Sequence, residues 1–84
     1  ELELNTVTEN KVREIIKLAN QHDLVDGKSP SGITAAALYI AGHQTKQIRT
    51  QREISDVTNV TEVTIRNRYK QLVKHLGIDI NVRP

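Results

Sequence analysis

Five side chains near the C-terminus have types and a spacing suited to binding a polyanion. They are Val63, Arg66, Asn67, Lys70 and Lys74. On a helix that advances about 100° per residue, all five fall on one side, and that set contains no acid. Arginine can donate two hydrogen bonds to guanine O6 and N7, and valine can touch a thymine methyl group. The pattern therefore indicates contact with nucleic-acid bases, with a merely solvated helix face as the competing interpretation.

The same stretch has a second side whose residues belong in a hydrophobic core. These residues are Ile65, Tyr69, Leu72, Val73 and Leu76. Thr61 is suited to cap the N-terminus of the helix, and Gly77 is suited to end it after about Leu76. We therefore expect an amphipathic helix with one buried face and one exposed basic face.

A shorter helix precedes this one, and the two together form a pattern typical of DNA-binding proteins. Thr50 and Glu53 have the S/T-x-x-E spacing of a capping box, and Ile54 and Val57 provide a short apolar face. Asn59 tolerates the left-handed conformation that a brief turn requires. A short helix, a turn and a longer basic helix make a helix-turn-helix. In that motif the second helix enters the major groove, and its first turns reach base edges.

Two further helices are expected upstream. The first is capped by Thr8, runs to about His22 and buries one apolar face. That face consists of Val12, Ile15, Ile16 and Ala19. The second covers about 30–43, follows the capping residue Ser29, and is ended with the help of Gly42. Because the second helix is apolar nearly all round, it should lie centrally with the other helices packed around it.

The length fits one small domain over 1–84, and the helical patterns make it all-α, with the helix-turn-helix at about 50–76. Hydrophobic residues make up 37% of the 84 positions, and only two side chains are aromatic, so Ile, Val, Leu and Ala must build the core. The absence of cysteine excludes disulfides, a thiolate zinc site and a cysteine nucleophile. No apolar run approaches the roughly 20 residues that span a membrane. These features predict a soluble intracellular domain.

Charge is distributed unevenly along the chain, although the net charge is only +2. Residues 46–76 carry seven Lys or Arg against three acids, whereas residues 1–45 carry four against six. A basic second half points towards a polyanionic partner. A solvated charged face explains the same distribution, so the charge alone leaves both interpretations open.

An enzyme or a metal centre fits the residue pattern poorly. His22, His43 and His75 are far apart in sequence, and no His-x-x-x-His pair or acidic cluster accompanies them. Asp23 and Asp26 flank a loop and are better interpreted as solvated. No glycine-rich phosphate loop is present. We therefore expect no catalytic residue, no metal ligand and no cofactor in these residues.

A series of motifs gives the chain a family resemblance over roughly residues 1–79. The motifs are "GKSP" before an alanine-rich helix, then "RTQRE", then "VTEVTIRNRYK", in order and at the right spacing. They resemble the second cyclin-like repeat of archaeal transcription factor B, the counterpart of the eukaryotic general factor TFIIB. The resemblance implies a cyclin-like repeat of five helices, of which four are visible here and the first would end at about "ELEL".

The resemblance also implies a function and its partners. In this family the repeat docks on TATA-binding protein bound to the TATA box. Its helix-turn-helix reads a purine-rich B recognition element just upstream, in the major groove, and so orients the preinitiation complex. The implied partners are double-stranded promoter DNA and TATA-binding protein. The implied location is the cytoplasm of an archaeal cell, or the nucleus if the host is eukaryotic.

Site residues can be carried over from the family one position at a time. The base-contacting positions match Val63 and Arg66, which the helical spacing independently places on the exposed face. The positions implied to contact the DNA backbone or to support the contact are Lys28, Ser29, Thr50, Gln51, Arg52, Thr61, Thr64, Asn67 and Lys70. Asn59 stands where the family often has glycine, so the turn should be retained but less relaxed.

Two parts of the family pattern have no counterpart in these residues. They are the zinc ribbon, which recruits RNA polymerase, and the first cyclin repeat, which makes much of the contact with TATA-binding protein. The chain looks like an excised fragment, so we expect weak DNA binding by itself and recruitment of polymerase only through the missing N-terminal region. The alternative is a cyclin-like module that docks on protein without sequence-specific DNA binding. The acid-free basic face argues against that alternative.

Overall fold

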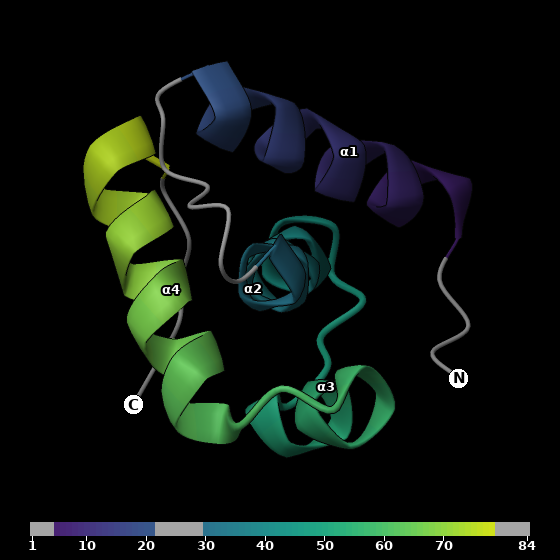
Figure 1. Ribbon diagram of the computed structural model, residues 1–84. Coiled ribbons are helices and arrows are strands. Elements are labelled where there is room, and N and C mark those ends of the chain that lie inside the picture. The colour runs from purple at the N-terminus through teal and green to yellow at the C-terminus, as the bar shows by residue number, and fades with distance from the viewer. Residues whose placement is uncertain (1–4, 22–29, 79–84) are drawn as a thin grey trace.

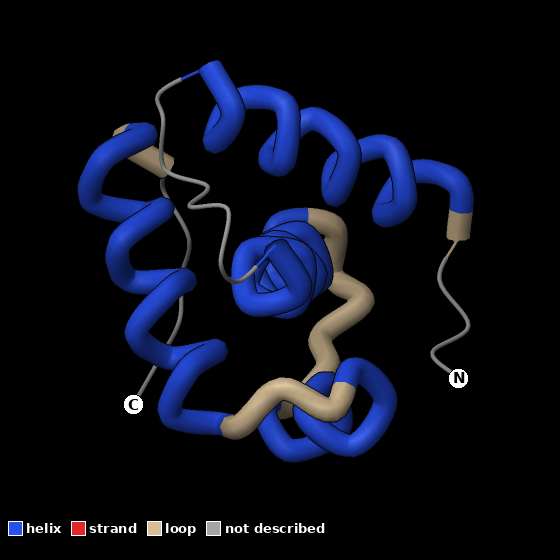
Figure 2. Tube along the Cα trace, viewed as in Figure 1, coloured by secondary structure: helices blue, strands red, loops and turns tan. Residues whose placement is uncertain are grey.

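The regular structure in the described part of the chain is helical. The computed structural model describes residues 5–21 and 30–78. Its helices are α1 (Thr6–Gln21), α2 (Pro30–Gln44), α3 (Gln51–Thr58) and α4 (Glu62–Leu76). Figure 1 shows α2 nearly end-on at the centre, with α1, α3 and α4 arranged around it. Figure 2 shows the short connections that join α2 to α3 and α3 to α4. The predicted all-α class and its four helices are confirmed.

The central position of α2 follows from its side chains, which are apolar on nearly every face. Its buried hydrophobic residues are Ile33, Ala35, Ala36, Ala37, Tyr39, Ile40 and Ala41. Burying apolar surface is the dominant favourable contribution to folding, and alanine side chains are small enough to let neighbouring helices approach. The prediction of a central helix is confirmed.

The core consists of two hydrophobic clusters that both use α2. The larger cluster joins α1, α2 and α4, and its buried members are Val12, Ile15, Ala19, Ile33, Ala36, Ala37, Ile40, Ala41 and Leu72. The smaller cluster joins α2, α3 and α4, and its buried members are Ala35, Tyr39, Ile54 and Ile65. The smaller cluster therefore fixes α3 and the first half of α4, while the larger one fixes the two long outer helices.

The start of α1 differs from the prediction, because Asn5 and not Thr8 caps the helix. The Asn5 side-chain oxygen accepts a hydrogen bond from the Thr8 backbone N–H (2.9 Å), and the Asn5 carbonyl accepts one from Glu9 (3.0 Å). Thr8 is instead fully buried. Its hydroxyl lies 2.7 Å from the Thr45 hydroxyl and donates to the Gln47 side chain (2.7 Å). Thr8 therefore ties the start of α1 to the end of α2.

The end of α2 also differs from the prediction, because the helix continues past Gly42 to Gln44. A Cβ atom at Gly42 would lie 2.8 Å from the Gln47 carbonyl oxygen, so the glycine allows the chain to pass close by as it leaves the helix. The backbone turns at Lys46, which has a φ of 62°. The Gln47 N–H then donates to the Gly42 carbonyl (2.9 Å), as in a Schellman-type helix end.

The apolar face of α3 is narrower than predicted. Ile54 is fully buried, whereas Val57 keeps 47% of its surface exposed. Two residues three positions apart on a helix point about 60° away from each other. α3 has only 8 residues and contacts α2 through one narrow side. Ile54 lies on that side and is buried, whereas Val57 points away from it towards solvent.

Candidate nucleic-acid interface

α4 is fixed to the rest of the molecule by the side chains that the sequence assigns to its core face. Ile65 and Leu72 are fully buried. Tyr69 is half-buried, and its ring centroid lies 4.7 Å from that of Tyr39 on α2. Two further half-buried side chains pack against the larger cluster, namely Val73 and Leu76. This packing sets the rotation of α4 about its axis and so decides which side chains face outward.

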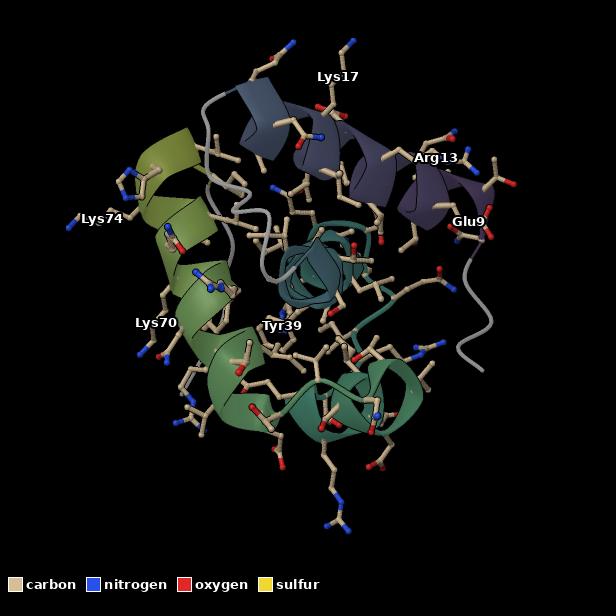
Figure 3. All side chains as sticks on the ribbon, viewed as in Figure 1. Glu9, Arg13, Lys17, Tyr39, Lys70 and Lys74 are labelled. Carbon is tan, nitrogen blue, oxygen red and sulfur yellow. The ribbon has the colours of Figure 1, made fainter. Side chains whose placement is uncertain are left out.

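The opposite side of α4 projects into solvent, as predicted. Val63 keeps 58% of its surface exposed, and the other exposed members of this face are Arg66, Asn67, Lys70 and Lys74. Figure 3 shows Lys70 and Lys74 pointing away from α2. Within residues 5–21 and 30–78, none of the three cations on this face has an ion-pair partner. Their positive charge is therefore uncompensated and available to attract a polyanion.

A pair of threonines closes the N-terminus of α4. The Thr61 hydroxyl accepts a hydrogen bond from the Thr64 backbone N–H (3.2 Å) and donates to the Thr64 hydroxyl (2.9 Å). The predicted cap at Thr61 is confirmed. Because a hydroxyl has one donor hydrogen and two acceptor lone pairs, Thr64 keeps its own hydroxyl hydrogen for another acceptor.

A short turn sets the position of α4 relative to α3. Asn59 has a φ of 62°, and its N–H donates to the Ser55 carbonyl (2.9 Å), which confirms the predicted left-handed residue. Val60 is half-buried against the smaller cluster. Its N–H donates to the Thr58 hydroxyl (3.3 Å), which in turn donates to the Ile54 carbonyl (2.7 Å). These contacts hold the two helices in one relative orientation.

The predicted capping box at the start of α3 is present. The Glu53 N–H donates to the Thr50 hydroxyl (3.0 Å), and the Thr50 N–H donates to the Glu53 carboxylate (2.9 Å). The hydrogen bond from the Thr50 N–H lowers the pKa of Glu53, against a smaller opposing effect of desolvation. After the cap come Gln51, which is half-buried, and Arg52, which is exposed. The start of α3 therefore presents a cation beside a well-ordered helix N-terminus.

Two other basic side chains of this region bond to neighbouring protein groups. Arg68 is half-buried and donates from Nη1 to the Gln71 side-chain oxygen (3.2 Å). Arg49 donates from Nη1 to the Ile48 carbonyl (3.2 Å). The excess of Lys and Arg in 46–76 therefore overstates the charge that the outer face of α4 presents.

The structure places most of the predicted site residues on α3 and α4. The exposed face of α4 carries Val63, Arg66, Asn67 and Lys70, and the start of α4 carries Thr61 and Thr64. The start of α3 carries Thr50, Gln51 and Arg52. The predicted supporting residues Lys28 and Ser29 lie outside the described residues.

The residues that the sequence predicts for the site do not include Glu62, the first residue of α4. The helical spacing places this side chain beside the predicted face and not within it. Glu62 is exposed and precedes Arg66 by four residues, which is one helical turn. The row of Glu62, Arg66 and Lys70 at four-residue steps is the signal that could have found it.

The residues weighed for catalysis do not come together. The His43 ring lies 4.6 Å from that of Tyr39, and burial lowers the pKa of His43. His75 is exposed near the end of α4, and His22, Asp23 and Asp26 lie outside the described residues. Residues 5–21 and 30–78 contain no group of three His, Cys, Asp or Glu side chains placed to hold a metal ion.

In the described part of the chain, no helix has the length and apolar character needed to cross a membrane.

Comparison with known proteins gives a match over nearly the whole chain. Residues 1–75 match the family described as transcription factor TFIIB repeat. The chain is 51% identical over 84 residues to transcription initiation factor IIB of Methanothermococcus thermolithotrophicus, an alignment that covers 98% of this chain and 24% of that protein. It is 51% identical over 79 residues to the factor of Archaeoglobus fulgidus, covering 94% and 24%. With the factor of Pyrococcus abyssi the identity is 50% over 82 residues, covering 98% and 27%. The chain thus spans about a quarter of these relatives.

Proposed function

We propose that this chain, which belongs to the family of transcription factor TFIIB repeats, is a DNA-binding repeat of a transcription initiation factor. The family membership confirms the resemblance drawn from the sequence motifs and, with the four helices, gives the chain a cyclin-like helical fold. The names of its relatives indicate transcription initiation and no class of enzyme. The observation that carries DNA binding is the exposed face of α4, where three cations lie together and no acid is among them.

In this proposal α3, the turn and α4 act as a helix-turn-helix. α4 enters the major groove with its first two turns towards the base edges. Arg66 donates two hydrogen bonds to guanine, and Val63 contacts a thymine methyl group or excludes water. The burial of Ile65 supports this arrangement, because it turns both residues outward from the core.

Contacts to phosphate fix the register of α4 in the groove. Lys70 lies one turn after Arg66 and supplies a charge for a phosphate, and Asn67 lies beside it on the same exposed face. Thr64 donates the hydroxyl hydrogen that the cap leaves unused, and Thr61 presents the N-terminus of α4. These contacts position the protein without selecting a sequence.

The start of α3 supplies a second group of backbone contacts. Its N-terminus, capped by Thr50, offers N–H groups to phosphate, and Arg52 adds a positive charge beside them. The remaining supporting residues, whose roles rest on the family resemblance, are Gln51, Lys28 and Ser29.

At the promoter, the proposed target is the purine-rich B recognition element upstream of the TATA box, and the proposed protein partner is TATA-binding protein. The family membership and the names of the relatives support this assignment. RNA polymerase is recruited through the N-terminal region of the whole factor. The repeat acts where the promoter is, which in an archaeal cell is the cytoplasm.

Two substitutions on the same face separate base reading from attraction to phosphate. Arg66→Ala should weaken binding to a duplex with the purine-rich element by about 1–3 kcal/mol and relax the preference at one base pair. Lys70→Ala should weaken binding to all duplexes alike. It should also make the slope of log K against the logarithm of the salt concentration shallower by about one. Fluorescence anisotropy with the purine-rich duplex and a scrambled one, at two salt concentrations, measures both effects.

Arg13→Ala on α1 is the matched control, because it removes an exposed arginine from a helix outside the proposed interface. It should leave the preference between the duplexes unchanged. If Arg66→Ala keeps the wild-type affinity and preference, α4 does not lie in the groove as proposed. Charge reversal by Arg66→Glu tests the alternative. If this variant still binds the complex of TATA-binding protein with DNA as tightly as wild type, a protein-docking module without base reading becomes the better account.

A further inference from the structure

The first residue of α4 is an acid at the edge of a face that otherwise carries cations. Glu62 is exposed and lies between the Thr61 cap and the exposed Val63. It also begins the row that continues with Arg66 and Lys70 at four-residue steps, so these side chains are neighbours on the helix surface. Side chains on a helix lean towards its N-terminus, so Glu62 extends beyond Arg66 at the leading end of α4.

The carboxylate of Glu62 differs from those of two other exposed acids in having no protein group to bind. Glu53 also lies in a first turn, but its carboxylate accepts the Thr50 N–H in the capping box. Glu14 pairs with Lys11 at 3.6 Å. Within residues 5–21 and 30–78, Glu62 has neither a side-chain hydrogen bond nor an ion pair, not even with Arg66 one turn away. Its oxygens are therefore available to a ligand of α4.

The chemistry of a carboxylate restricts what it accepts in the major groove. An ionised carboxylate only accepts hydrogen bonds. The donors on base edges are the N4 amino group of cytosine and the N6 amino group of adenine, whereas guanine and thymine present acceptors at the corresponding positions. Every base pair carries one such amino group, on its adenine or its cytosine, so a carboxylate selects the orientation of the pair that brings this group within reach. A carboxylate also repels phosphate, so it lowers affinity wherever the amino group is out of reach.

We infer that Glu62 is a specificity-determining residue of the proposed interface, whose carboxylate accepts a hydrogen bond from an exocyclic amino group of cytosine or adenine next to the base pair that Arg66 contacts. This inference rests on the proposed function. Arg66 and Glu62 then select in opposite senses, since the arginine requires acceptors and the carboxylate requires a donor. Two adjacent base pairs are read by two side chains one turn apart.

A different role for Glu62 would be purely structural. An acid in the first turn interacts favourably with the positive end of the helix dipole and so stabilises the helix. That role predicts a lower melting temperature when the charge is removed, and no change in base preference. The two roles therefore differ in a binding measurement.

The test compares Glu62→Gln with wild type on a panel of duplexes that carry each base pair in turn at every position of the purine-rich element. Anisotropy at low salt gives the affinity for each duplex. Wild type should prefer an amino-bearing base by about tenfold at one position next to the Arg66 contact. In Glu62→Gln a preference for cytosine should fall to within about twofold, because the amide both donates and accepts, while the affinity for the other duplexes rises. Glu62→Ala, which cannot make the amide pair that glutamine makes with adenine, should remove the preference for either base.

Glu9→Gln is the matched control, since it removes the same charge from the first turn of α1. It should leave every preference unchanged, which would assign the effect to the position of Glu62. The inference is overturned if Glu62→Ala keeps the wild-type preference, or if Glu62→Gln and Glu9→Gln raise all affinities equally. If wild type itself does not distinguish the purine-rich duplex from a scrambled one, the proposed function fails and the inference with it. Thermal melting of both variants measures the dipole contribution separately.

Discussion

α1 and α4 are nearly equal in length, 16 and 15 residues, and both pack an apolar face on α2, yet their outer faces differ in charge. Figure 3 shows Glu9, Arg13 and Lys17 along the outside of α1, an acid together with two bases. On the same helix Lys11 pairs with Glu14 at 3.6 Å. The outer face of α4 carries cations that have no such partner among the described residues.

The difference separates what builds the fold from what serves the proposed function. Both inner faces follow the same rule, because each must bury apolar side chains against α2. A helix that needs only to be soluble can mix charges on its outer face, as α1 does. An outer face that carries three cations and an exposed valine, with a single acid at its edge, has no role in the packing of α4 and is accounted for by the proposed contact with DNA. Substitutions matched between the two helices test this separation.

The largest expected effects come from the inner faces, where the two helices should behave alike. Ile15 on α1 keeps 1% of its surface exposed, and Ile65 on α4 is fully buried. Replacing either by alanine should lower the free energy of unfolding by about 2–5 kcal/mol through lost burial and a cavity. Urea denaturation followed by circular dichroism measures the loss. Ile→Val at each site, costing about 0.5–1.5 kcal/mol, keeps the comparison possible if an alanine variant does not fold. A cost confined to one helix would break the equivalence of the inner faces.

The helix caps should give the next largest effect, again of similar size in α1 and α4. Asn5→Ala and Thr61→Ala each remove a side chain that accepts a backbone N–H at a helix start. Each should cost about 1 kcal/mol of stability. The difference between the helices should appear only in DNA binding, where Thr61→Ala weakens affinity and Asn5→Ala does not. Equal melting temperatures of Asn5→Ala and wild type would show that Asn5 does not cap α1.

The smallest expected effect is a pH dependence at the start of α3. The Thr50 N–H lowers the pKa of Glu53 in the folded chain. A depressed pKa in the folded state means that the stabilisation is present above the unfolded pKa of about 4.3 and is lost as the pH falls through the folded value. The melting temperature of wild type should therefore drop more than that of Glu53→Gln between pH 6 and pH 3. Parallel pH profiles would show that the carboxylate contributes nothing to the capping box.

Local sequence patterns predicted the α3 and α4 region well. The capping box of Thr50 and Glu53, the left-handed Asn59 and the Thr61 cap all involve partners within four residues, so local rules are sufficient. The two faces of α4 were also predictable, because helical periodicity alone separates them. The same periodicity places Glu62 beside the predicted face, so it does not select this acid, although Glu62 lies one helical turn before Arg66.

The failures occurred where distant segments meet. Thr8 resembles a helix cap, but Thr45 and Gln47 engage its hydroxyl from 37 and 39 positions away along the chain. Gly42 resembles a helix terminator, but the structure uses its missing side chain to let the backbone at Gln47 pass close by. Val57 resembles a core residue, but α3 is too short and too narrowly packed to bury it. A single sequence without tertiary contacts gives no signal for any of these.

The central claim is that the outer face of α4 reads bases while that of α1 does not, and an NMR titration of the isotope-labelled chain tests it most directly. The ligands are a short duplex with a purine-rich element upstream of a TATA box and a scrambled duplex, each at two salt concentrations. The account predicts amide shifts confined to residues 50–70, larger for the specific duplex and retained at the higher salt concentration. Equal shifts with both duplexes that vanish with salt, or shifts along α1 of the same size, would contradict it.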